Sequence, residues 1–153
     1  MRAFVERGGL WVTGQALLFV LVGFMGFYFR STFHLSGSGI AGFVLLAGGG
    51  LVGLAGVLAI GRGLTPFPKP ALGTRLVTTG IYRFIRHPLY LAVLLGASGW
   101  GLVRESWPAL ASALALGVFL NAKAGHEERY LLLQFPDYRA YAVRVRRFIP
   151  GVW

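Results

Sequence analysis

The chain alternates long apolar stretches with short segments that carry nearly all of its charged residues. No charged residue occurs in positions 8–29, and a second charge-free stretch covers positions 31–61. A helix of about 20 apolar residues is long enough to cross a bilayer. The pattern therefore predicts transmembrane helices at about residues 9–29 and 39–60.

Two shorter apolar stretches follow, at residues 88–103 and 107–122, joined by a polar turn of three residues. This arrangement predicts a helical hairpin, and the helix at 107–122 is expected to carry a cytoplasmic extension. A β-barrel is not expected, because the stretches are continuously apolar rather than alternating. The sequence thus predicts an all-α integral membrane protein with four transmembrane helices, a polar loop at residues 61–87 and a single domain over residues 1–153.

Composition supports burial in lipid. Hydrophobic residues make up 56% of the chain and charged residues 13%, about half the charged fraction of a typical soluble domain. The net charge of +10 comes from basic residues that flank the apolar stretches. This placement indicates contact with anionic lipid headgroups, and nucleic acid is not an expected partner. The absence of cysteine excludes disulfides and thiolate chemistry.

The basic residues also predict the orientation of the helices. Thirteen of the fifteen lysines and arginines precede the first helix, lie in the loop at 61–87 or follow the fourth helix, and only Arg30 and Arg104 lie on the other side. Positively charged connections remain in the cytoplasm. We therefore expect a multi-pass protein of the cell (inner) membrane with both termini in the cytoplasm.

The C-terminal tail, residues 136–153, has a different pattern. Tyr138, Tyr141, Val145 and Phe148 share one face of a predicted helix, and arginines occupy the other face. A basic amphipathic helix of this kind lies along a membrane surface. We expect it to cover a pocket on the cytoplasmic side.

The second predicted span contains a pair of small residues, Gly49 and Gly53. Small residues four positions apart let two helix backbones approach closely. Packing within the helical bundle is the favoured interpretation, and a contact in a homodimer is the alternative.

Polar residues cluster at the cytoplasmic ends of the two hairpin helices. The hairpin should make these two clusters neighbours, and ionisable groups near the membrane plane are usually functional. An ion pair between Arg86 and one of two glutamates would need no ligand, and two histidines could instead hold a haem. The residues concerned are Arg83, Arg86, His87 and Tyr90 in the first cluster and Lys123, His126, Glu127, Glu128 and Arg129 in the second.

The same residues carry a resemblance to a known family. Residues 76–90, which contain Arg-His-Pro-Leu-Tyr, resemble a segment of the isoprenylcysteine carboxyl methyltransferase family. Residues 127–132, 135–141 and 147–150 resemble the closing signature of that family. The similarity covers about residues 64–153. The chain departs from the family pattern at Ala92 and Pro136, two positions where glycine is common in the family.

The resemblance implies an S-adenosylmethionine-dependent methyltransferase that acts on a lipophilic or lipid-like acceptor at the membrane. A carboxylate acceptor is favoured, a phospholipid amine is the alternative, and a non-catalytic or haem-binding helical protein is the alternative of another class. Glu127 and Arg144 are the candidate catalytic residues, and no metal is expected. The candidate cofactor-binding residues are Arg86, His87, Tyr90, His126, Glu128, Tyr138 and Tyr141.

Overall fold

The structure is a computed structural model that describes residues 8–69 and 73–148. All regular elements in these two ranges are helical, in agreement with the predicted all-α class. In chain order they are α2 (Gly9–Tyr28), α3 (Ser38–Ile60), the 3-10 turns η1 (Gly61–Gly63) and η2 (Gly80–Arg83), α4 (Pro88–Val103), α5 (Trp107–Gln134) and α6 (Tyr138–Arg144).

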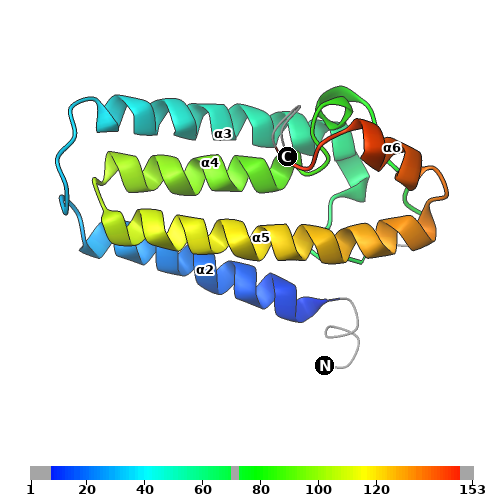
Figure 1. Ribbon diagram of the computed structural model, residues 1–153, viewed down its shortest axis with the longest axis horizontal. Helices are drawn as coiled ribbons and strands as arrows, with labels where there is room; N and C mark the ends of the chain where they lie inside the picture. The colour runs from blue at the N-terminus through cyan, green and yellow to red at the C-terminus, as the bar shows by residue number, and fades with distance from the viewer. Residues whose placement is uncertain (1–7, 70–72, 149–153) are drawn as a thin grey trace.

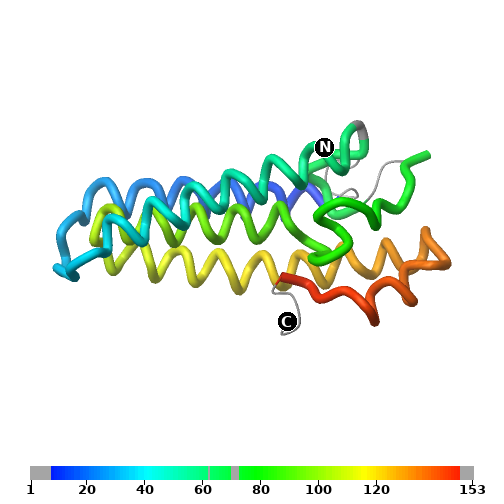
Figure 2. The backbone as a smooth tube through the Cα atoms, turned by 90° about the horizontal axis from the view of Figure 1, so that it is seen from above, coloured from blue at the N-terminus to red at the C-terminus, as the bar shows by residue number. Residues whose placement is uncertain are grey.

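The four long helices run along one axis and form two packed pairs (Figure 1). Helix α3 packs on α4, α2 packs on α5, and α4 and α5 pack on each other between the two outer helices. The segment between α3 and α4 lies at the same end of the bundle as α6 (Figure 2). This end therefore collects the long loop, the start of α4 and the end of α5.

Three of the described helices, α2, α3 and α5, are long and apolar enough to cross a membrane. Their outward faces carry exposed leucine, valine and phenylalanine side chains, which suits contact with lipid. Helix α4 has 16 residues and a length of about 24 Å, shorter than a hydrocarbon core of about 30 Å. Its assignment as a fourth span remains a prediction. Helix α5 continues past the apolar stretch as far as Gln134, where an extension beyond residue 122 was expected.

The glycines of α3 let this helix approach α4 closely. A Cβ atom on Gly49 would lie 2.8 Å from the Ala92 carbonyl oxygen, and one on Gly53 would lie 3.3 Å from the Ala92 Cβ. The small-residue pair thus packs inside the chain, as the favoured interpretation expected. Ala92, which stands where the family often has glycine, faces Gly49 and Gly53 of α3. Because these two residues have no side chains, there is room for the Ala92 methyl group.

At the opposite end of the bundle, Glu105 joins the two short connections. Its carboxylate accepts hydrogen bonds from the Ser38 hydroxyl at 2.8 Å and from the His34 ring at 3.0 Å. Its carbonyl oxygen accepts from the backbone N–H and the hydroxyl of Thr32. The hydrogen bonds from Ser38 and His34 hold the pKa of the Glu105 carboxyl below its usual value. Glu105 therefore ties the α2–α3 connection to the turn of the hairpin.

The C-terminal tail differs from the predicted long helix. Helix α6 ends at Arg144, and the backbone is extended at Val145. Ile85 and Arg146 form an isolated parallel β-bridge, which explains the early end of the helix because the backbone now pairs with the segment before α4. The predicted buried face is nevertheless present, since Val145 and Phe148 are buried. Residues 149–153 of the predicted tail lie outside the described residues.

Candidate active site

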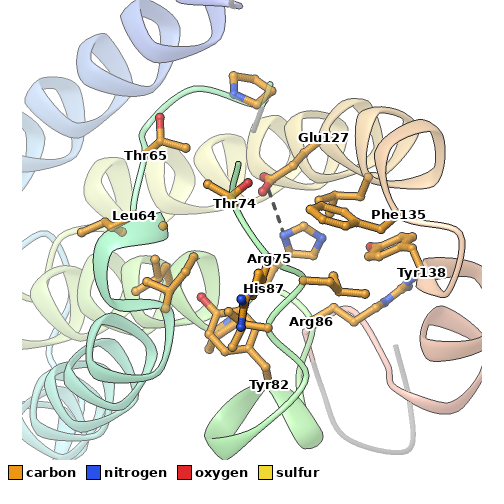
Figure 3. Close-up of a pocket in the computed structure, with 18 of the residues that line it drawn as sticks. Leu64, Thr65, Thr74, Arg75, Tyr82, Arg86, His87, Glu127, Phe135 and Tyr138 are labelled. Carbon is orange, nitrogen blue, oxygen red and sulfur yellow. Dashed lines mark ion pairs between the residues drawn. The ribbon is translucent and has the colours of Figure 1, made fainter. Parts of the chain in front are cut away.

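A cavity opens at the end of the bundle that carries the long loop and α6. Its walls come from the end of α3, segments 64–68 and 74–77, the start of α4, the last turns of α5, and α6. Figure 3 shows Leu64 and Thr65 on one side and Phe135 and Tyr138 on the opposite side. The space between the atoms is about 860 Å³, counting the mouth that is open to solvent.

The start of α4 is held by the C-terminal segment. The backbone N–H of Arg86 donates to the Arg146 carbonyl at 2.9 Å, and that of His87 donates to the Arg147 carbonyl at 3.0 Å. His87 is the N-cap of α4, but its side chain makes no capping hydrogen bond. The imidazole instead points to α5, where Nε2 lies 3.0 Å from Glu128 Oε1. The predicted approach of His87 to the paired glutamates is therefore confirmed.

Glu128 is the centre of a partly buried charge cluster. Arg147 donates from Nε to Oε1 at 3.1 Å and from a terminal nitrogen to Oε2 at 2.6 Å. Arg86 lies 3.4 Å from Oε1, and His87 contacts the same oxygen. The ion pair expected between Arg86 and a glutamate is thus present. Both oxygens of Glu128 are occupied by protein groups, and Glu128 does not line the cavity.

Glu127 has a different environment from its neighbour. Its carboxylate lines the cavity, accepts a hydrogen bond from the Tyr90 hydroxyl at 2.7 Å and lies 3.9 Å from His87 Nδ1. Successive helical residues point about 100° apart, which separates the roles of the two carboxylates. Glu127 is the acidic residue among the described residues that line the cavity.

Two tyrosines of α6 cover the cavity. Tyr138 is 2% exposed, and its hydroxyl has no hydrogen-bond partner in the part of the chain that is described. The Tyr141 hydroxyl donates to the Tyr82 carbonyl at 2.6 Å. Burial raises the pKa of Tyr141 to about 12 and also raises that of Tyr138. Both phenols therefore remain neutral at physiological pH, and the hydrogen-bonding capacity of the Tyr138 hydroxyl is not used by any described group.

The structure brings six of the nine candidate residues to the cavity. These are Arg86, His87, Tyr90, Glu127, Tyr138 and Tyr141.

The other three candidates lie elsewhere. Glu128 is the centre of the charge cluster behind the cavity wall. His126 points away from the cavity, because its ring stacks on Trp11 at 5.4 Å between ring centroids and also contacts Tyr130. Arg144 is exposed, and its Nε donates to the Ala140 carbonyl of its own helix. A role for Arg144 in steering an anionic acceptor remains a prediction.

Several further residues of the site had no predicted role. Arg75 and Phe135 line the cavity, and Arg147 binds Glu128. Lys123 belonged to a polar stretch of the sequence but had no predicted contact. Phe135 and Arg147 belong to the closing signature of the family resemblance, and this was the feature of the sequence that pointed to them.

The fold and the cavity define a helical membrane protein with a pocket at one end of its bundle, lined by apolar side chains and a few polar ones. A family described as phospholipid methyltransferase matches residues 38–137, which include α3, α4, α5 and much of the pocket lining. The chain therefore belongs to the phospholipid methyltransferase family, whose members use S-adenosylmethionine. This membership, together with the relative named isoprenylcysteine O-methyltransferase below, confirms the resemblance found in the sequence.

Three curated relatives align with about half of the chain. The cobalt-zinc-cadmium resistance protein CzcN of Cupriavidus metallidurans is 42% identical over 76 residues, which are 49% of this chain and 35% of the relative. The nickel-cobalt-cadmium resistance protein NccN of Alcaligenes xylosoxydans xylosoxydans is 40% identical over 78 residues, or 50% and 37% of the two chains. The protein-S-isoprenylcysteine O-methyltransferase of Schizosaccharomyces pombe is 35% identical over 77 residues, or 49% and 33%. The chain spans about a third of the length of the curated relatives that it matches.

Proposed function

We propose that the chain is a membrane-embedded, S-adenosylmethionine-dependent methyltransferase that binds its cofactor in the cavity and methylates a lipophilic acceptor. Two residues of the cavity lining carry this proposal, because Arg86 Nε and the Tyr138 hydroxyl are buried without a partner in the described ranges. Leaving a buried polar group unsatisfied costs about 1–3 kcal/mol. A polar ligand that bonds to these atoms would remove that cost.

The residues of the cavity fit the charges of this cofactor. The Glu127 carboxylate suits its cationic groups, and the Arg86 guanidinium suits its carboxylate. The Tyr90 ring is already stacked on His87 and lies under the Lys123 ammonium, so the Tyr138 ring is the aromatic candidate for facing a cation or stacking on adenine. The Glu127 carboxylate lines the cavity and accepts a short hydrogen bond from the Tyr90 hydroxyl at one oxygen. Its other oxygen can therefore face a cationic group of the cofactor.

When bound, the cofactor supplies a methyl group on a sulfonium, which the acceptor takes by in-line displacement. A carboxylate acceptor is already a nucleophile and needs no base, so the cavity contributes alignment and exclusion of water. An amine acceptor must lose a proton, for which Glu127 is the best placed of the candidate bases. Glu128 has both oxygens occupied, and His126 lies outside the cavity lining.

A carboxylate on a lipophilic molecule is the favoured acceptor, in keeping with the name of the S. pombe relative. A phospholipid amine is the second candidate, in keeping with the description of the family. The haem-binding alternative has less support, because His87 and His126 contact different partners. Basic residues at the cavity end of the bundle support a cytoplasmic position for the cavity.

Calorimetric titration of the detergent-solubilised protein with S-adenosylmethionine, and with its demethylated product, tests the proposal. We expect saturable binding of both, which His87→Ala weakens because the imidazole lines the cavity. Lys69→Met is the control, since Lys69 is exposed and outside the cavity lining. Absence of binding to the native protein would refute the cofactor assignment. Lipid analysis of cells with and without the protein then separates the acceptors, because methylated headgroups would identify the phospholipid activity.

A further inference from the structure

Lys123 is a buried lysine for which the proposed reaction has no direct use. It lies on α5, is 1% exposed, and donates to Gln15 Oε1 at 2.5 Å and to the Pro66 carbonyl at 3.0 Å. Its ammonium also lies over the Tyr90 ring, 5.3 Å from the centroid. The three protons of the ammonium therefore have two oxygens and a ring face as partners.

These partners belong to parts of the molecule that are distant in sequence. Pro66 belongs to segment 64–68, which forms one wall of the cavity. Tyr90 lines the cavity and holds Glu127. Gln15 belongs to α2, which contributes no described residue to the cavity lining. Lys123 thus links a cavity wall, a cavity side chain and a remote helix.

A second contact ties the same wall to the start of α2. Pro68 is almost fully buried, and a Cβ atom on Gly8 would lie 2.9 Å from Pro68 Cδ. Helix α2 lies outside the residues that match the family, which begin at residue 38. In this chain α2 therefore supports the cavity wall in addition to being an apolar helix.

Burying a lysine is costly unless the charge is well partnered. The other lysine of the chain, Lys69, is exposed only three residues after Pro66. A lysine that only increased the solubility of this region would not need to be buried. The burial is explained by the bond to the Pro66 carbonyl, which fixes an irregular segment that has no helix of its own.

We propose that Lys123 is a positioning residue, which holds the 64–68 wall and the Tyr90 ring in the arrangement that binds the cofactor, with α2 as the support through Gln15. The expected effect on the cofactor rests on the proposed function. The expected effect on the wall does not. The two effects can therefore be measured separately.

The absence of cysteine in the chain provides a direct test of the wall. A single Thr65→Cys substitution places a thiol in the 64–68 wall, and its rate of modification by a water-soluble maleimide reports how firmly the wall is held. We expect Lys123→Met to raise this rate several-fold and to weaken S-adenosylmethionine binding by about tenfold. Lys123→Arg should restore part of both, because it restores a charged donor, whereas Lys69→Met should change neither.

Gln15→Leu is the second variant, which keeps the test valid should Lys123→Met fail to fold. It removes one acceptor of the Lys123 ammonium and leaves the hydrogen bond to the Pro66 carbonyl. The modification rate should therefore rise, and S-adenosylmethionine binding should weaken, by less than in Lys123→Met. Wild-type modification rates in every folded variant would overturn the proposal, as would weaker binding with an unchanged modification rate. If the unsubstituted protein binds no cofactor, the proposed function fails, and the modification rates still decide the role of Lys123.

Discussion

Replacement of Glu128 or Glu127 by glutamine should affect different properties of the protein: stability in the first case and cofactor binding in the second. Glu128→Gln removes the negative charge that partners Arg147, Arg86 and His87. The glutamine amide can accept on one side only, and its N–H groups face donors on the other. Breaking a buried ion pair by removing one partner costs about 3–5 kcal/mol. With about 2–4 °C per kcal/mol for a chain of this size, we expect Tm to fall by roughly 6–20 °C.

Glu127→Gln is the matched change one residue away. The Glu127 side chain is 26% exposed, against 12% for Glu128, and its short hydrogen bond comes from the Tyr90 hydroxyl, which a glutamine oxygen can still accept. We expect a stability loss of about 1 kcal/mol or less. Binding of S-adenosylmethionine should nevertheless weaken strongly, because the carboxylate that faces the cavity has lost its charge.

Thermal unfolding in detergent, followed by circular dichroism, measures the first effect, and calorimetric titration well below Tm measures the second. The reasoning requires Glu128→Gln to have the larger loss of Tm. It also requires Glu127→Gln to lose affinity while keeping nearly the native Tm. Equal losses of Tm in the two variants, or a larger loss for Glu127→Gln, would refute the assignment of Glu128 as the structural carboxylate.

Three further predictions test other parts of the structure. Gly49→Ala should destabilise the protein because its Cβ would meet the Ala92 carbonyl at 2.8 Å. Gly50→Ala meets nothing within 4 Å and should be neutral or stabilising by up to about 1 kcal/mol, so comparison of the two Tm values tests the contact. The pKa of Glu105 is lowered in the folded state, so its contribution to stability is present at neutral pH and lost as pH falls below its unfolded pKa of about 4.3. The Tm difference between the native protein and Glu105→Gln should therefore shrink over that pH range, and a constant difference would contradict the assignment. Tyr138→Phe should leave Tm unchanged or slightly raised, because the hydroxyl has no partner among the described residues. It should weaken S-adenosylmethionine binding in titration, and an unchanged affinity would show that the hydroxyl does not contact the cofactor.

The helices were largely predictable because lipid imposes a simple pattern on the sequence. Charge-free stretches at residues 8–29 and 31–61 correspond to α2 and α3. The end of α5 was less predictable, since polar residues after residue 122 extend a helix as readily as they end one. The end of α6 at Arg144 depends on backbone pairing with a segment about 60 residues away. Spacing within the tail gave no information about that partner.

The site was predictable where one helical hairpin determines it. Helices α4 and α5 are joined by a short turn, so the start of one must meet the end of the other, and His87 reaches Glu128 as expected. Contacts that involve the long loop could not be predicted in this way. Lys123 bonds to Pro66, and no periodicity relates a position on a helix to a carbonyl in an irregular segment.

The rotation of α5 decides what each of its consecutive polar residues does. His126, Glu127 and Glu128 follow one another at about 100° intervals, so they face three different neighbours. The first meets Trp11 of α2, the second faces the cavity, and the third meets Arg147 of the C-terminal segment. The sequence shows the three side chains together but does not show which one faces the cavity, because that depends on how α5 packs against α2 and α4. Assigning the cofactor contact to Glu127 therefore requires the packing of the helices, and the paired substitutions at 127 and 128 test that packing directly.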